Sequence, residues 1–213
     1  MGGLSHGWRQ TARALGLALI LAGMPATAHV PYFETSDLSA EAPFVVRNIE
    51  QSKAIYAYLE SKGDSDQYLL LVREPVRIYA KTIIPYCSKY TDFRPSFALI
   101  GPGLPAVSET LPAEIPAGHG AIVVHDPPVG ASRPSMYEFF SDQFYFEAPV
   151  LDMRVSEPGD YRIVYWDPSG EVGDYVAIIG RREEFSAEDM SRSMTNTIEL
   201  RKRSYIHGDC EEP

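Results

Sequence analysis

The histidines are the residues of this sequence best suited to bind a transition metal. If the chain is cut after Ala28, His29 becomes the first residue and carries a free α-amine beside its imidazole, and these two nitrogens can chelate one ion. His119 and His125 lie near predicted loops and are the candidates for a further ligand. Three nitrogen ligands favour copper. The alternative is that His29 only marks where a peptidase cuts.

Acidic turn residues offer a second metal site. Asp64 and Asp66 alternate along the segment after Gly63, so a tight turn there directs both carboxylates toward one hard cation. Calcium bound in this way would fasten loops together outside the cell. Turns also favour Asp and Gly for backbone reasons, and a plain turn is the alternative interpretation.

Motifs for hydrolytic catalysis are absent from the sequence. It contains neither the Gly-x-Ser-x-Gly motif of a nucleophilic serine nor the His-Glu-x-x-His motif of a zinc protease. We therefore predict no catalytic residues and no cofactor beyond copper or calcium. A group of aromatic residues forms either a platform for sugar rings or the core and cross-strand pairs of one hairpin. Its members are Tyr137, Phe139, Phe140, Phe144, Tyr145 and Phe146.

The chain is acidic. Its 19 basic and 29 acidic residues give a formal net charge of -10, and loss of residues 1–28, which contain two arginines and no acid, changes this to -12. A surface of this sign repels phosphate backbones and anionic lipids. We therefore expect neither nucleic acid nor a membrane surface as a partner, whereas cations remain compatible ligands.

Residues 1–28 have the layout of a secretory signal peptide. Arg9 and Arg13 precede an apolar run at residues 14–24, and Ala26-Thr27-Ala28 supplies the small residues that signal peptidase accepts. An uncleaved anchor is the alternative, but the run is shorter than the roughly twenty residues that span a bilayer. We predict cleavage, a periplasmic or extracellular location, and no membrane span in the mature chain.

Two cysteines remain after cleavage, Cys87 and Cys210. Export places thiols where they oxidise, so the two can pair and tie the C-terminal tail to the body of the domain. In the chain-entropy model, a bridge that closes so long a loop contributes roughly 4 to 5 kcal/mol. The alternative is that Cys210, close to the C-terminus, stays free.

The apolar segments of the chain are short, rich in β-branched and aromatic residues, and separated by turn residues. Segments 161–166 and 175–179 flank the turn residues 167–170, and we predict that they pair as a hairpin at the centre of a β-sandwich. The proline-rich segments 101–120 and 125–134 are predicted surface loops, and the first is a candidate binding rim.

The pattern changes after Gly180. Ser186 followed by Asp189 indicates a helix N-terminus, and Met190, Met194 and Ile198 recur every four residues, as on one face of a helix. We predict that this stripe packs into the core, and a groove for a partner is the alternative.

The predicted fold class is all-β, a jelly-roll-like β-sandwich with a short C-terminal α-helix. The predicted divisions are a signal peptide at residues 1–28, an extended N-terminal arm at 29–43, the sandwich at 44–182, and a C-terminal helix and tail at 183–213.

Several motifs resemble those of the bacterial pre-peptidase C-terminal domain. They are residues 49–56, the turn Gly-Asp-Ser-Asp-Gln-Tyr at 63–68, and the Gly-Asp-Tyr triplets at 159–161 and 173–175. That family is a small jelly-roll-like β-sandwich appended to secreted enzymes. The resemblance therefore implies a secreted sandwich that binds or packs against another molecule. The chain departs from the family in its proline-rich inserts.

The segment Ala28-His29-Val30-Pro31 also resembles the start of uncharacterised exported β-sandwich proteins with a mature N-terminal histidine. Lytic polysaccharide monooxygenases and some periplasmic copper carriers look similar in this respect, which implies copper at His29. We predict an exported, non-catalytic binding or accessory module whose partner is an extracytoplasmic protein or a carbohydrate. The alternatives are a copper-binding protein that uses His29 and a calcium-stabilised structural domain.

Overall fold

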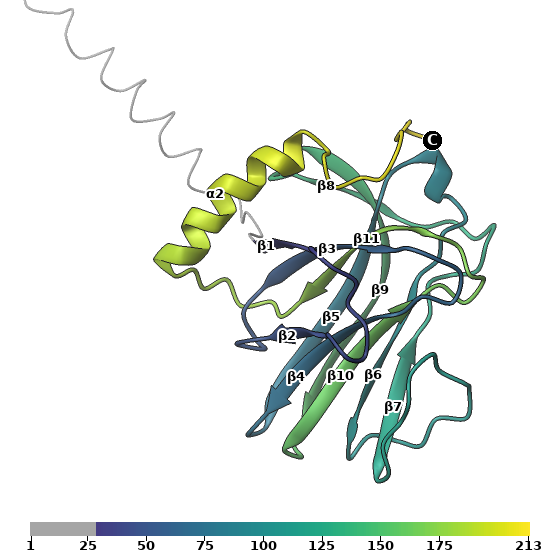
Figure 1. Ribbon diagram of the computed structural model, residues 1–213, viewed down its shortest axis with the longest axis vertical. Coiled ribbons are helices and arrows are strands. Elements are labelled where there is room, and N and C mark those ends of the chain that lie inside the picture. The colour runs from purple at the N-terminus through teal and green to yellow at the C-terminus, as the bar shows by residue number, and fades with distance from the viewer. Residues whose placement is uncertain (1–28) are drawn as a thin grey trace, which may run out of the picture.

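The computed structural model describes residues 29–213, and the predicted signal peptide lies outside the described residues. In this part of the chain, two β-sheets pack face to face and one α-helix lies near the C-terminal end (Figure 1). The prediction of an all-β sandwich with a short C-terminal helix is confirmed.

Sheet A contains, in spatial order, β1 (Val30–Phe33), β3 (Lys53–Leu59), β11 (Gly173–Ile179), β5 (Val76–Pro85), β9 (Gln143–Val155) and β8 (Ser135–Glu138). Sheet B contains β2 (Phe44–Val46), β4 (Asp66–Val72), β10 (Gly159–Trp166), β6 (Ser96–Pro102) and β7 (His119–Val124). The antiparallel order β3-β11-β5-β9 opposite β4-β10-β6-β7 is that of an eight-stranded jelly roll. β1 and β2 add parallel strands at the edges beside β3 and β4.

Segments 161–166 and 175–179 are the central strands, but they do not pair with each other. β10 pairs with β4 and β6 in sheet B, whereas β11 pairs with β3 and β5 in sheet A. The predicted hairpin is therefore wrong, and the turn between the two strands carries the chain from one sheet to the other.

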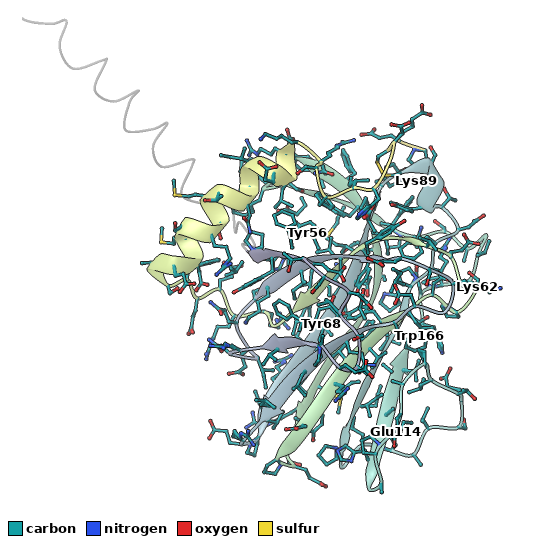
Figure 2. The ribbon with its side chains drawn as sticks, in the orientation of Figure 1. Tyr56, Lys62, Tyr68, Lys89, Glu114 and Trp166 are labelled. Carbon is teal, nitrogen blue, oxygen red and sulfur yellow. A yellow bond between two sulfur atoms is a disulfide. The ribbon has the colours of Figure 1, made fainter. Side chains whose placement is uncertain are left out.

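Tyrosines fill the space between the sheets. Tyr68, Tyr165 and Tyr175 are fully buried, and the ring centroid of Tyr165 lies 5.3 Å from that of Tyr68 and 5.0 Å from that of Tyr175. Figure 2 shows Tyr68 inside the sandwich. Buried hydroxyls usually have a hydrogen-bond partner, and those of Tyr68 and Tyr175 do. Tyr175 donates to Asp66 at 2.6 Å, and the Tyr68 hydroxyl lies 2.9 Å from that of Tyr175.

Residues 29–43, predicted as an extended arm, belong to the sandwich. β1 pairs in parallel with β3, and Val30 and Pro31 are buried there. The chain then crosses between the sheets. The Glu34 N–H donates to the Tyr56 carbonyl in sheet A at 2.9 Å, and the Gln67 N–H in sheet B donates to the Leu38 carbonyl at 2.6 Å.

The single α-helix in residues 29–213, α2 (Ala187–Arg201), has the predicted N-terminus, with Ser186 and Asp189 forming a capping box. Its stripe of Met190, Met194 and Ile198 is 57 to 74 % exposed, so the prediction that the stripe packs into the core is wrong. No helix in residues 29–213 has the length and apolar character needed to span a membrane.

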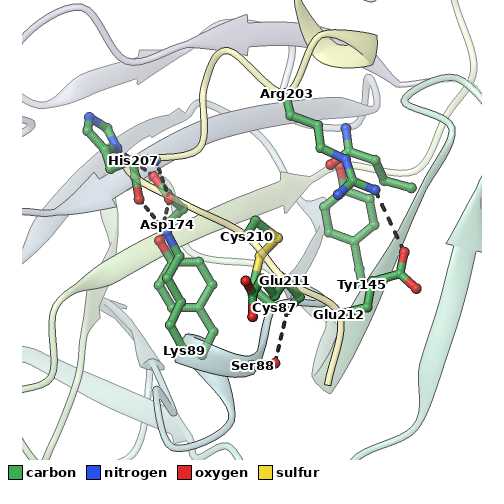
Figure 3. The surroundings of a disulfide bond; sticks show 12 residues. Cys87, Ser88, Lys89, Tyr145, Asp174, Arg203, His207, Cys210, Glu211 and Glu212 are labelled. Carbon is green, nitrogen blue, oxygen red and sulfur yellow. Dashed lines mark hydrogen bonds and ion pairs between the residues drawn. A yellow bond between two sulfur atoms is a disulfide. The ribbon is translucent and has the colours of Figure 1, made fainter.

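The tail after α2 returns to the sandwich and is fastened there. Cys210 forms a disulfide with Cys87, with Cα atoms 5.0 Å apart (Figure 3). The Ser88 N–H, at the start of the 3-10 helix η1 (Ser88–Tyr90), donates to the Glu211 carbonyl at 2.7 Å. The tail therefore lies in a fixed position on the molecule.

The predicted loops connect β6 to β7 and β7 to β8. The first loop packs apolar side chains, among them Val107, Leu111 and Ile115, against the outer face of sheet B around Val164 and Trp166. This candidate binding rim therefore buries its own apolar side chains against the sandwich.

Candidate metal centre

Three carboxylates from separate parts of the sequence meet at the edge of the sandwich. Glu34, Asp37 and Asp66 each offer an oxygen, and these oxygens lie within 4.8 Å of one another. In residues 29–213 no other group of three or more His, Cys, Asp or Glu side chains has this spacing. Asp66 was a predicted ligand, whereas sequence reasoning missed Glu34 and Asp37.

The backbone around these residues explains why they meet. Glu34 follows directly after β1, Asp37 lies in the segment that crosses from sheet A to sheet B, and Asp66 is the first residue of β4. The cluster therefore forms where the crossing segment passes between the two sheets.

Two carboxylate oxygens of the cluster are buried without a hydrogen-bond partner. Asp66 is fully buried, and its Oδ2 accepts the Tyr175 hydroxyl at 2.6 Å while its Oδ1 has no partner. The Oε2 of Glu34 accepts the Tyr58 N–H at 2.8 Å, and its Oε1 likewise has none. A buried polar atom left in this way costs about 1 to 3 kcal/mol. Both oxygens can be satisfied by a proton or a cation.

The raised pKa values of Asp66 and Glu34 also show that these carboxylates are unfavourable as bare anions. Desolvation by burial, followed by repulsion from Glu34, raises the pKa of Asp66 to about 8. Desolvation, with added repulsion from Asp37 and other acids, raises the pKa of Glu34 to about 7. Near neutral pH these groups therefore retain protons that a bound cation can displace.

Asp64, the other residue predicted to bind calcium, has a different role. Its Oδ2 accepts the Glu60 N–H at 2.6 Å, and the Asp64 N–H donates to the Ser61 carbonyl at 3.0 Å. These bonds stabilise the turn between β3 and β4, and Asp64 does not belong to the carboxylate cluster.

The predicted copper ligands lie on different elements. His29 precedes β1, where its Nδ1 lies 2.5 Å from the Ser52 hydroxyl and burial lowers the pKa of its imidazole. His119 begins β7, an edge strand of the other sheet, and His125 follows β7. The Nε2 of His125 lies 3.1 Å from a Glu109 carboxylate oxygen. The copper site stays a prediction.

The aromatic group of residues 137–146 divides into buried and exposed members. Tyr145 and Phe146 are buried and Phe140 is half-buried, whereas Tyr137, Phe139 and Phe144 are 46 to 67 % exposed. Tyr137 and Phe144 are directly paired across β8 and β9, with ring centroids 5.3 Å apart. The predicted cross-strand pairing is present, but these three rings, named here the aromatic strip, lie outside the core.

No model of a known protein family matches the chain, and a search of curated proteins finds no relative. The fold and the site define a jelly-roll β-sandwich with a carboxylate cluster at its edge. The resemblance to the pre-peptidase C-terminal domain stays a prediction.

Proposed function

We propose that this protein is an exported β-sandwich module that binds calcium at Glu34, Asp37 and Asp66. The observation that carries the proposal is the fully buried Asp66, whose Oδ1 has no partner and lies beside two further carboxylates. Calcium prefers carboxylate oxygens and accepts six to eight of them in flexible geometry. Asp37 is exposed, so an ion can enter from solvent and keep water among its ligands.

Bound calcium would fasten the N-terminal segment to both sheets. Glu34 is attached to β3 through the Tyr58 N–H, whereas Asp66 belongs to β4. One ion held by both residues would join the two sheets at their open edge. An exported protein meets calcium at concentrations at which extracellular sites, with a Kd of about 0.1 to 1 mM, are occupied.

The test is a calorimetric titration of the purified protein with calcium. Asp37→Asn removes one charge of the cluster without disturbing the core, because this side chain is exposed. Asp160→Asn is the matched control, since Asp160 is an exposed aspartate on β10. We expect saturable binding to the wild type and the control, and at least about tenfold weaker binding to Asp37→Asn. Equal affinity in all three proteins, or no binding to any, would refute the proposal.

A second candidate function, carbohydrate binding, is supported by the aromatic strip. Exposed rings of Tyr and Phe can stack on the apolar faces of sugars. The strip lies at the β8 edge of sheet A. Affinity electrophoresis through polysaccharide gels should show retardation of the wild type that is lost in Phe139→Ala and retained in Val129→Ala, a change at another exposed apolar residue. Equal mobility of all three proteins on every polysaccharide would contradict this candidate.

A further inference from the structure

A pocket of about 430 Å³ opens on sheet A beside the carboxylate cluster. Its lining includes the rings of Phe33, Tyr56 and Tyr205, whose centroids lie 4.7 to 6.4 Å apart. Tyr58 also lines the pocket and stacks on the ring of His207, with centroids 3.9 Å apart. A cavity of this volume is large enough for a small molecule.

The pocket lining carries acidic side chains. Glu34, Glu60 and Glu199 line it, and its described lining contains neither lysine nor arginine. Lys202 pairs with Glu199 from outside the lining, with a nitrogen-to-oxygen distance of 2.9 Å. Glu60 is exposed and has no such ion pair within the described part of the chain, so it makes the pocket attractive to a cation.

The C-terminal wall of the pocket is held in place by the protein itself. The Nδ1 of His207 lies 2.7 Å from Oδ1 of the buried Asp174, and the His207 N–H donates to Oδ2 of the same carboxylate at 2.8 Å. Figure 3 shows His207 against Asp174, with Cys210 and its disulfide on the same tail. A wall fixed in advance reduces the entropy that a ligand loses on binding.

The positions of the acids fit an organic cation better than a metal ion. Glu60 and Glu199 do not belong to the group of carboxylates whose oxygens converge within 4.8 Å. A metal needs converging ligands, whereas an alkylammonium group is attracted by ring faces and by carboxylates at longer range. We propose that this pocket binds a small alkylammonium ion, with its charge near Glu60 and its alkyl groups on the aromatic rings.

This site is separate from the calcium site, although Glu34 borders both. The ammonium proposal rests on Glu60 and the aromatic lining, neither of which belongs to the carboxylate cluster. The two proposals can therefore fail independently. Asp37→Asn tests calcium binding, whereas changes at Glu60 and Phe33 test the pocket.

The experiment is a calorimetric titration with choline and with its uncharged isostere 3,3-dimethylbutan-1-ol, at a fixed calcium concentration. Glu60→Gln removes an exposed charge, and Phe33→Leu removes one ring but keeps an apolar side chain. Glu114→Gln is the matched control, because Figure 2 places Glu114 at the opposite end of the molecule from Tyr56. We expect choline to bind the wild type and the control equally and each pocket variant about twofold to fivefold more weakly.

The uncharged isostere should bind at least about tenfold more weakly than choline, because it lacks the cation–π and carboxylate attraction. A parallel titration with N-acetyl-trimethyllysine amide identifies the source of the ammonium group. Tighter binding of this compound than of choline assigns the site to a protein side chain, and the reverse assigns it to a free small molecule. Equal binding of choline and its isostere, or unchanged affinity in both pocket variants, would overturn the proposal.

Discussion

Replacing Asp66 by asparagine tests two effects of this buried carboxylate on stability: a loss as pH rises without a cation, and a gain when calcium is added. The raised pKa of about 8 means that the folded protein retains a proton that the unfolded chain, with a pKa near 3.8, releases. Without a cation, this group therefore lowers the stability of the wild type as pH rises from about 4 to about 8. At about 1.4 kcal/mol per pH unit, the loss is roughly 6 kcal/mol at most.

Under the proposal that calcium binds the ionised cluster, calcium should reverse this loss. For a Kd of about 0.1 to 1 mM, about 10 mM calcium stabilises the folded state by about 1.4 to 2.7 kcal/mol. In a domain of this size, that stabilisation raises the Tm by about 3 to 10 °C. The rise should be absent from Asp66→Asn, which lacks the buried carboxylate of the cluster.

Thermal unfolding followed by circular dichroism, between about pH 5 and pH 8, checks both effects. In chelator, the Tm of the wild type should fall with rising pH relative to that of Asp66→Asn, because only the wild type has a buried carboxylate at position 66 to ionise. In calcium, only the wild type should recover. Asp160→Asn, with its change on the exposed side of β10, should follow the wild type throughout. An equal calcium-dependent rise in Asp66→Asn, or parallel pH profiles in chelator, would refute the reasoning.

Three further changes test other parts of the structure by urea unfolding. Cys210→Ser should lower the free energy of unfolding by up to about 4 to 5 kcal/mol, and a smaller loss than about 1 kcal/mol would contradict the fastening role of the tail. Met194→Ser should change it by less than about 0.5 kcal/mol, because this side chain is 74 % exposed. Tyr175→Phe should cost about 1 to 3 kcal/mol, because Asp66 loses its buried hydrogen bond. Stability equal to that of the wild type would count against this last bond.

The sequence predicted most strands correctly but not the partner of each strand. Segments 161–166 and 175–179 are apolar on both faces, and β11 is buried along its whole length. An apolar run between two turns is compatible with a hairpin or with neighbouring strands of opposite sheets. The choice depends on pairing with β3, β4, β5 and β6, which are distant in sequence.

The carboxylate cluster was only partly predictable for a related reason. Asp66 was found through its turn motif, but Glu34 and Asp37 lie about thirty residues earlier and reach it only because β1 pairs with β3. The one sequence signal that marked them was the acidic character of residues 29–43. That signal predicted an arm in solvent, since charge is usually exposed.

The methionine stripe shows that a periodic pattern can predict a helix without predicting which of its faces is buried. A spacing of four places Met190, Met194 and Ile198 on one face of a helix, but it does not determine which face contacts the sheet. Two residues of α2 contact the sandwich on another face. Leu200 is buried, and the side-chain amide of Asn196 donates to the Pro31 carbonyl at 2.9 Å. Polar contacts with the N-terminal segment thus contribute to setting the rotation of the helix.

The two terminal segments of the described chain have a common place in the fold. The jelly roll runs from β3 to β11 and has its full strand order without residues 29–43 and 183–213. Both segments nevertheless line the same pocket, one through Phe33 and Glu34 and the other through Tyr205 and His207. The disulfide fastens the second segment, and calcium at Glu34 would fasten the first. Reduction of the disulfide releases the tail that carries Tyr205 and His207, so it should weaken choline binding before it unfolds the sandwich.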